Sequence, residues 1–201
     1  MYTLLKPLQV REELLERNMR IFTPEEFSRL FQTPKHVTKY FLEKQTMYGL
    51  FLRLKKGLYF LKTDPPSEEE IANSLYKPSY ISFEYALSYY GILAEMPYTV
   101  TSATTKPTRL FTLNNMSFSY YTIKDHLFTG YSLIKLGSKS FLIADKEKAL
   151  VDYLYFESLG KKPHNDRLNL SGIDKEKLQE YLKLFKRKSF IKYVKRTYVN
   201  A

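Results

Sequence analysis

Basic and hydroxyl side chains gather in two short stretches of the first third of the chain. Residues 34–48 supply five candidate hydrogen-bond donors, which are Lys35, His36, Thr38, Lys39 and Thr46. A few residues later come three further cations, which are Arg53, Lys55 and Lys56. Lys and Arg neutralise phosphates, and Lys and Thr also hydrogen-bond base edges in the major groove of DNA. These side chains predict recognition of phosphates and bases without bond chemistry; His36 either contacts phosphate or is an ordinary surface histidine.

Helix-start signals precede this basic stretch and a hairpin signal follows it. Residues 23–26 (Thr-Pro-Glu-Glu) combine an N-cap, a proline at the first helical position and a capping-box glutamate. Thr33 and Pro34 repeat the cap-plus-proline signal ten residues later, which predicts a second helix after a tight turn. Strand-like runs at 50–54 and 58–61 flank Lys-Lys-Gly and predict a hairpin. Helix, turn, helix and hairpin are the order of elements in a winged helix-turn-helix domain, which we expect at 1–64.

A helical wheel over residues 34–48 assigns the faces of the second helix. The predicted inner face holds Val37, Tyr40, Phe41 and Tyr48. The predicted outer face holds Lys35, Lys39 and Thr46, flanked by Thr38, Glu43 and Gln45. In this register Leu42 is expected to be exposed and Lys44 to reach out past the apolar side. Leu52 and Leu54 are expected to point inward from the hairpin.

The predicted helix and hairpin also have interpretations that involve no DNA. The helix could be an ordinary solvated surface helix, and the hairpin a lysine-rich edge that prevents strand pairing. Winged folds also serve as protein-interaction modules.

The end of the chain carries a second basic surface. Its cations are Lys183, Lys186, Arg187, Lys188, Lys192, Lys195 and Arg196. They alternate with apolar residues in two expected amphipathic helices near 174–186 and 188–198. This surface is either a second contact with DNA or an acidic partner, or a helix pair that packs on its domain and keeps its lysines in water.

Composition narrows the class of protein. The 201 residues carry a net charge of +11, with surpluses before residue 66 and after residue 173 around a neutral middle. That distribution favours a polyanion contacted at defined surfaces. An aromatic fraction of 16% excludes intrinsic disorder, and the lack of cysteine excludes disulfides and thiol chemistry. Neither a signal peptide nor a long apolar run is evident, so we expect a cytoplasmic protein without membrane association.

The middle and end of the chain predict an α+β domain at 67–201. The linker 62–67 contains two prolines, and Ser67 with Glu70 forms a capping box for the next helix. Further helices are expected at 82–91, between a Ser cap and a Gly stop, and from an Asp145 cap to about residue 156. Strands are expected between residues 98 and 144, with turns at 114–115 and 137–138.

Signals for catalysis are weak. Gly137-Ser138 followed by Asp145 and Glu147 is only faintly similar to the metal-binding pattern of nucleotidyltransferases, and the spacing is short. There is no phosphate-cradling glycine loop, no nucleophile elbow and no histidine pair at ligand spacing. We expect no enzyme, no cofactor and no metal site.

Several segments taken together resemble the AbiEi antitoxins of bacterial type IV toxin–antitoxin and abortive infection systems. They are residues 53–59 (RLKKGLY), 71–75 (IANSL), 78–87 (PSYISFEYAL), 90–91 (YG) and 147–152 (EKALVD). The resemblance runs from about residue 20 to residue 160. It gives 78–87 and 148–152 no chemical role; physically they are expected to be core, with a salt bridge at Lys148 or Asp152.

The resemblance implies a transcriptional repressor that binds repeats in its own promoter and serves antiviral defence. If the operator on double-stranded DNA is repeated, a two-fold related second copy of the chain, as a dimer, would contact the other half-site. The resemblance also implies a second domain that acts against a cognate nucleotidyltransferase-like toxin. DNA contact would then belong to the helix 34–47 and the hairpin 53–57. Two alternatives remain, which are a protein-interaction module and an RNA-binding protein that stacks bases on its Tyr- and Phe-rich sheet.

Overall fold

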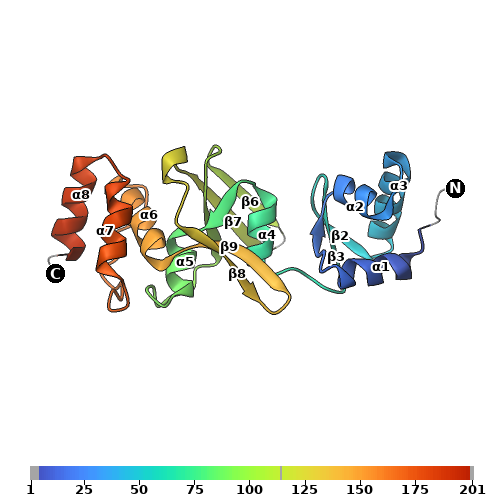
Figure 1. Cartoon of the computed structure of the whole chain (residues 1–201), viewed down its shortest axis with the longest axis horizontal. Coiled ribbons are helices and arrows are strands. Elements are labelled where there is room, and N and C mark those ends of the chain that lie inside the picture. The colour runs from blue at the N-terminus through green and yellow to red at the C-terminus, as the bar shows by residue number, and fades with distance from the viewer. Residues whose placement is uncertain (1–4, 114, 200–201) are drawn as a thin grey trace. The chain divides into compact units, whose positions relative to one another are not determined.

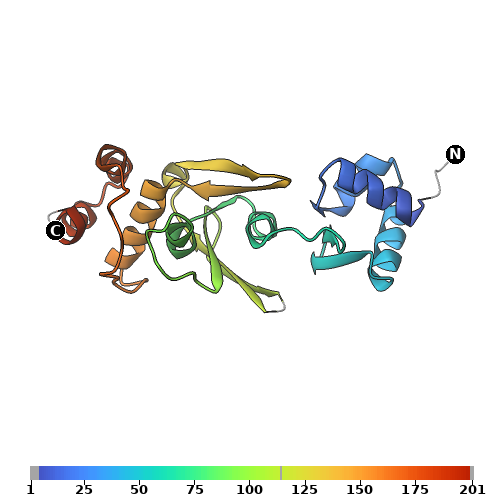
Figure 2. The same ribbon diagram turned by 90° about the horizontal axis from the view of Figure 1, so that it is seen from below.

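The computed structural model describes residues 5–113 and 115–199 and shows a mixed α+β chain (Figures 1 and 2). The chain divides into two compact units. The first contains the chain up to Leu75 together with residues 136–139, and the second contains the remainder. Contacts therefore group residues 65–75 with the first unit, whereas the sequence predicts a boundary at 64–67. No helix within the described ranges is long and apolar enough to cross a membrane.

The first unit combines helices with a small antiparallel sheet. Its elements are α1 (Pro7–Glu16), β1 (Ile21–Phe22), α2 (Pro24–Phe31), α3 (Lys35–Met47), β2 (Phe51–Lys55), β3 (Leu58–Leu61) and α4 (Glu68–Leu75). The strand order is β1-β3-β2. The predicted hairpin is confirmed by the antiparallel pairing of β2 with β3.

Local hydrogen bonds explain where α2 begins and how tightly α3 follows it. Thr23 Oγ1 accepts from the Glu26 amide at 3.2 Å, and the Glu26 carboxylate accepts from the Thr23 amide at 2.8 Å. This capping box satisfies two amides that the first helical turn leaves unpaired. Gln32 ends α2 in the left-handed conformation, and α3 begins directly after Pro34. The predicted tight turn and second helix are therefore confirmed, whereas the predicted cap is wrong, because Pro34 rather than Thr33 is the N-cap residue and no side chain caps α3.

Aromatic side chains form the core of the first unit. Phe22 packs against Phe27 and Phe51 with ring centroids 5.6 and 5.3 Å apart, and Phe41 lies 5.8 Å from Phe27. Phe41 comes from α3, whereas Phe51 comes from β2. One cluster therefore fixes the helix and the hairpin that carry the basic side chains.

The second unit is built on a mixed sheet of order β6-β7-β5-β4-β9-β8. Its strands are β4 (Ser79–Ile81), β5 (Thr99–Thr104), β6 (Arg109–Leu113), β7 (Met116–Thr122), β8 (Tyr131–Leu136) and β9 (Lys139–Ala144). Its helices are α5 (Phe83–Tyr89), a 3-10 turn (Asp125–Leu127), α6 (Lys146–Ser158), α7 (Lys175–Lys183), α8 (Lys188–Val194) and a π-helical turn (Lys195–Val199). α6 packs against α5 and also against α7 and α8 (Figure 2).

Asp145 and Ser82 are the N-cap residues of α6 and α5, as predicted, but neither side chain accepts a hydrogen bond from the first turn of its helix. Asp145 precedes α6, but its carboxylate accepts from Tyr181 Oη at 2.8 Å and pairs with Lys177 Nζ at 2.9 Å. Ser82 precedes α5, and its hydroxyl donates to Asp152 at 2.9 Å. Tertiary partners therefore replaced local capping at both sites. The predicted turn at 137–138 is confirmed, whereas Asn114 lies outside the described residues.

Candidate nucleic-acid interface

The buried face of α3 differs from the predicted one. Its buried members are Thr38, Phe41, Leu42 and Gln45. Tyr40 and Tyr48 were expected inside, but they are 65% and 73% exposed. Leu42 was expected outside, but it is 1% exposed. Of the predicted inner residues only Phe41 is buried.

A rotation of the helix by about a quarter of a turn accounts for these errors. The wheel treated tyrosines as apolar anchors, although a tyrosine hydroxyl favours a surface where it can meet water. The observed buried set follows the i, i+3, i+4, i+7 pattern of one helical face. That set contains two polar residues, Thr38 and Gln45. A wheel that assigns the buried face from apolar residues alone does not include them.

The two predicted threonine contacts both have hydroxyls that are hydrogen-bonded within the first unit. Thr38 is 1% exposed and shares a hydrogen bond of 2.8 Å with Thr33 Oγ1, so its prediction as a base-contacting residue is wrong. Thr46 is half-buried and donates to the Leu42 carbonyl at 2.7 Å. Its hydroxyl proton is thereby engaged within the helix and is not available to a phosphate or base acceptor.

The exposed face of α3 nevertheless carries most of the predicted cations. Lys35, His36 and Lys39 are exposed, as expected. Five further side chains are exposed, which are Tyr40, Tyr48 and Lys44, expected on or beside the apolar side, Glu43, expected on the flank, and Met47, for which no face was predicted. Lys44 is exposed rather than covered by apolar neighbours. Its ammonium lies 5.7 Å from the Tyr40 ring centroid and 6.0 Å from the Tyr48 centroid, within cation–π range.

The three predicted cations of the hairpin, Arg53, Lys55 and Lys56, are all exposed, but two of them donate to backbone carbonyls. Arg53 Nε donates to the Lys55 carbonyl at 3.2 Å, and the Arg53 guanidinium lies 6.0 Å from the Tyr59 centroid. Lys55 donates to the Leu75 carbonyl at the end of α4. A register shift between Arg53 and Lys55 breaks the strand's alternation. Leu54 is therefore buried as predicted, whereas Leu52 is exposed and its prediction is wrong.

The basic surface at the end of the second unit has an apolar inner side. All seven predicted cations of 183–196 are exposed. Between them, Phe185 and Phe190 are buried and lie 4.9 and 5.4 Å from the Tyr155 ring of α6. The packing reading of these helices is thus borne out for their apolar side. Their exposed cations remain available for the predicted contact with DNA or with an acidic partner, which stays a prediction.

The expected salt bridge in the segment 148–152 is present in the core. Lys148 pairs with Asp152, and both side chains are fully buried. Asp152 also accepts from Tyr80 Oη at 3.1 Å and from Ser82 Oγ at 2.9 Å. Burial, reinforced by Asp152, raises the pKa of Tyr80 well above its usual value, so its hydroxyl remains a donor. This network satisfies its members internally and acts as a structural element.

Comparisons with known proteins assign neither a family nor a function to the chain. No protein-family model matches the chain, and no curated protein matches it. Over residues 5–113 and 115–199, no group of three or more His, Cys, Asp or Glu side chains is arranged to hold a metal ion.

Proposed function

We propose that this protein is a DNA-binding transcriptional autorepressor that also serves as the antitoxin of a type IV toxin–antitoxin pair. The observation that carries the DNA-binding part is the set of exposed cations on α3 and on the β2–β3 hairpin, two elements that pack on one aromatic core. Lys35, Lys39 and Lys44 line the helix, Arg53 and Lys56 the hairpin, and all five side chains are exposed. The order and packing of α2, α3 and the hairpin support a winged helix-turn-helix reading of the first unit.

Affinity and sequence selectivity come from different side chains in this proposal. Lys35, Lys39 and Lys44 contact phosphates on the two sides of a major groove, while the hairpin cations grip the flanking backbone. Base contacts come from the middle of the exposed face, where His36, Tyr40 and Glu43 lie. A glutamate repels phosphates but accepts from the cytosine amino group, so Glu43 contributes selectivity rather than affinity. No bond is made or broken.

The antitoxin part rests on the sequence resemblance to AbiEi proteins. In this reading the second unit acts against a nucleotidyltransferase-like toxin, within the cytoplasm of the cell that makes both. The repressor binds repeated half-sites as a dimer. The outward cations of α7 and α8 are its candidate contact with the toxin or with DNA.

Fluorescence anisotropy with the duplex upstream of this gene tests the repressor reading. The upstream duplex is expected to bind about a thousandfold or more tightly than a scrambled duplex of equal length. Equal affinities with steep salt dependence would reduce the surface to a generic polyanion contact. Absence of binding to either duplex would contradict the proposal and favour a protein-interaction module.

A cluster of cations and rings in the second unit favours RNA as a second candidate ligand. The Arg109 guanidinium lies 5.3 Å from the Phe111 centroid, and the Lys106 ammonium lies 5.5 Å from the Tyr76 centroid. Exposed cations beside rings are typical of surfaces that stack single-stranded bases. Under this candidate, Arg109→Glu weakens binding to single-stranded RNA, and Lys39→Glu leaves that binding unchanged.

A further inference from the structure

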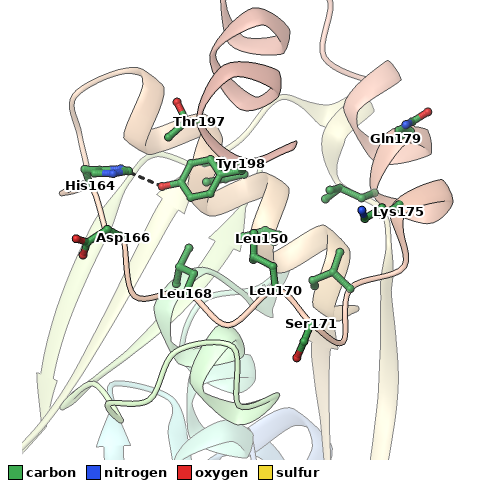
Figure 3. A pocket seen from close by; sticks show the side chains of 13 residues that line it. Leu150, His164, Asp166, Leu168, Leu170, Ser171, Lys175, Gln179, Thr197 and Tyr198 are labelled. Atoms are coloured by element: carbon green, nitrogen blue, oxygen red, sulfur yellow. Dashed lines mark hydrogen bonds between the residues drawn. The ribbon is translucent and has the colours of Figure 1, made fainter. Parts of the chain in front are cut away.

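A cavity of about 700 Å³ lies within the second unit, between α6, the segment 164–173, α7 and the end of the chain (Figure 3). Apolar side chains form much of its lining, namely Leu150, Leu154, Leu168, Leu170, Ile173 and Leu178. Its size is within the range of pockets that enclose small organic ligands. The apolar lining favours a ligand with a substantial hydrocarbon part.

The polar side chains at one end of the cavity are hydrogen-bonded to one another around Glu157. Tyr198 Oη donates to the Glu157 carboxylate at 2.9 Å, and His164 Nδ1 lies 2.6 Å from the same carboxylate. Asn165 adds a backbone amide at 3.3 Å. Burial, followed by the hydrogen bond to Glu157, raises the pKa of Tyr198, which therefore remains protonated. This end closes the cavity without presenting a free charge to a ligand.

Lys175 supplies the charge that the cavity presents. Figure 3 shows its ammonium directed into the cavity from α7, whereas the Asp166 carboxylate points away from it. Among the described residues, the Lys175 ammonium has no ion-pair or hydrogen-bond partner. Arg167 and Arg196, next in sequence to lining residues, are exposed and basic. An unpaired cation beside an apolar lining is complementary to an anion with an aliphatic chain.

We propose that this cavity is a binding site for a single-chain anionic amphiphile, of the class of a fatty carboxylate. The aliphatic chain lies against the leucines, and the carboxylate pairs with Lys175. The cavity and all residues invoked belong to the second unit, so this site is independent of DNA recognition by α3.

Isothermal titration calorimetry of the full chain with monomeric dodecanoate tests the site. We expect saturable binding of one dodecanoate, with affinity rising about fourfold for each methylene added between octanoate and dodecanoate. Dodecyltrimethylammonium, which has the same chain and the opposite charge, is expected to bind at least tenfold more weakly. Lys175→Glu is expected to weaken dodecanoate binding at least tenfold. Lys183→Glu is the matched control, because Lys183 is exposed on the same helix but does not line the cavity.

Methyl NMR of leucine-labelled wild-type protein gives a second measurement that needs no variant to fold. Dodecanoate is expected to shift the methyl signals of Leu150, Leu168, Leu170 and Leu178, and to leave Leu14 and Leu61 of the first unit unchanged. The proposal is overturned by an absence of saturable binding, by equal losses in the two lysine variants, or by shifts confined to other leucines. Binding to anionic phospholipid vesicles without any binding of monomeric dodecanoate would equally overturn it, because a basic surface would then suffice.

Discussion

Lys148 and Asp152 form an ion pair in the second unit whose two side chains are fully buried, so neither charge is solvated by water. A buried ion pair is tolerated when its remaining donors and acceptors are also satisfied. Here Tyr80 and Ser82 complete the hydrogen bonding of the carboxylate. The pair therefore links α6 to β4 and to the start of α5.

Removing one partner of this pair is expected to cost much more than removing both. Lys148→Met leaves the Asp152 carboxylate buried without its cation and is expected to lower the free energy of unfolding by about 3–5 kcal/mol. The double variant Lys148→Met/Asp152→Leu is expected to recover part of that loss. Urea unfolding followed by circular dichroism measures both. A single variant as stable as the wild type would show that the pair is not closed to solvent.

Thr38 and Lys39 are sequence neighbours in α3, one buried and the other exposed, which makes them a matched pair for DNA binding. Lys39→Ala is expected to weaken binding and to reduce the slope of log affinity against log salt by about one. Thr38→Val, which alters only a buried contact, is expected to keep DNA affinity within about twofold. Anisotropy over a salt series measures both quantities. A larger loss of affinity for Thr38→Val than for Lys39→Ala would contradict the observed register of α3, which buries Thr38 and exposes Lys39.

At the scale of elements, sequence signals predicted the start of α2, the position of α3 and the β2–β3 hairpin. These features depend on local chemistry, namely a capping box, a proline and a glycine turn. The register of α3 was not predictable in the same way. Thr38 faces inward because Thr33 offers it a hydrogen bond, and Lys55 is engaged because α4 ends beside it. The Thr33 partner is only five residues from Thr38, but a count of apolar residues gives it no weight, and the Leu75 partner of Lys55 is twenty residues away in the chain.

The capping box of α2 is expected to make a measurable contribution to the first unit. Thr23→Ala removes the acceptor for the Glu26 amide and is expected to cost about 1 kcal/mol of unfolding free energy. Glu25→Gln is the control, because Glu25 is exposed in the same turn and is not a member of the box. Urea unfolding compares the two variants. Equal effects of the two variants would contradict a specific contribution of the capping box.

At the scale of the whole molecule, tyrosines couple stability to alkaline pH. Burial first, and then Asp145, raises the pKa of Tyr90 to about 12. Burial likewise raises the pKa values of Tyr120, Tyr153 and Tyr181. An unfolded tyrosine loses its proton near pH ~10, before the folded one does. The contribution of these tyrosines to the free energy of unfolding is therefore fully present below about pH 10 and is lost as pH rises through the folded pKa values.

Urea midpoints at about pH 8 and about pH 11 test this coupling. We expect a lower midpoint at the higher pH. Tyr90→Phe, which has no phenolic proton, is expected to show a smaller difference between the two conditions. A midpoint that does not change with pH would contradict the burial of these hydroxyls.

Exposed cations gather in two parts of the chain, one comprising α3 and the β2–β3 hairpin and the other residues 183–196 at the end of α7, in α8 and around it. The central claim is that DNA recognition belongs to the first of these. Lys35→Glu/Lys39→Glu and Lys183→Glu/Lys186→Glu lower the net charge equally, so they separate position from total charge.

Anisotropy with the upstream duplex at one ionic strength is the most direct measurement. The account predicts a loss of roughly a hundredfold or more in affinity for the α3 variant, and a change within about threefold for the α7 variant. Equal losses in the two variants would contradict it, because net charge rather than the α3 face would then determine binding.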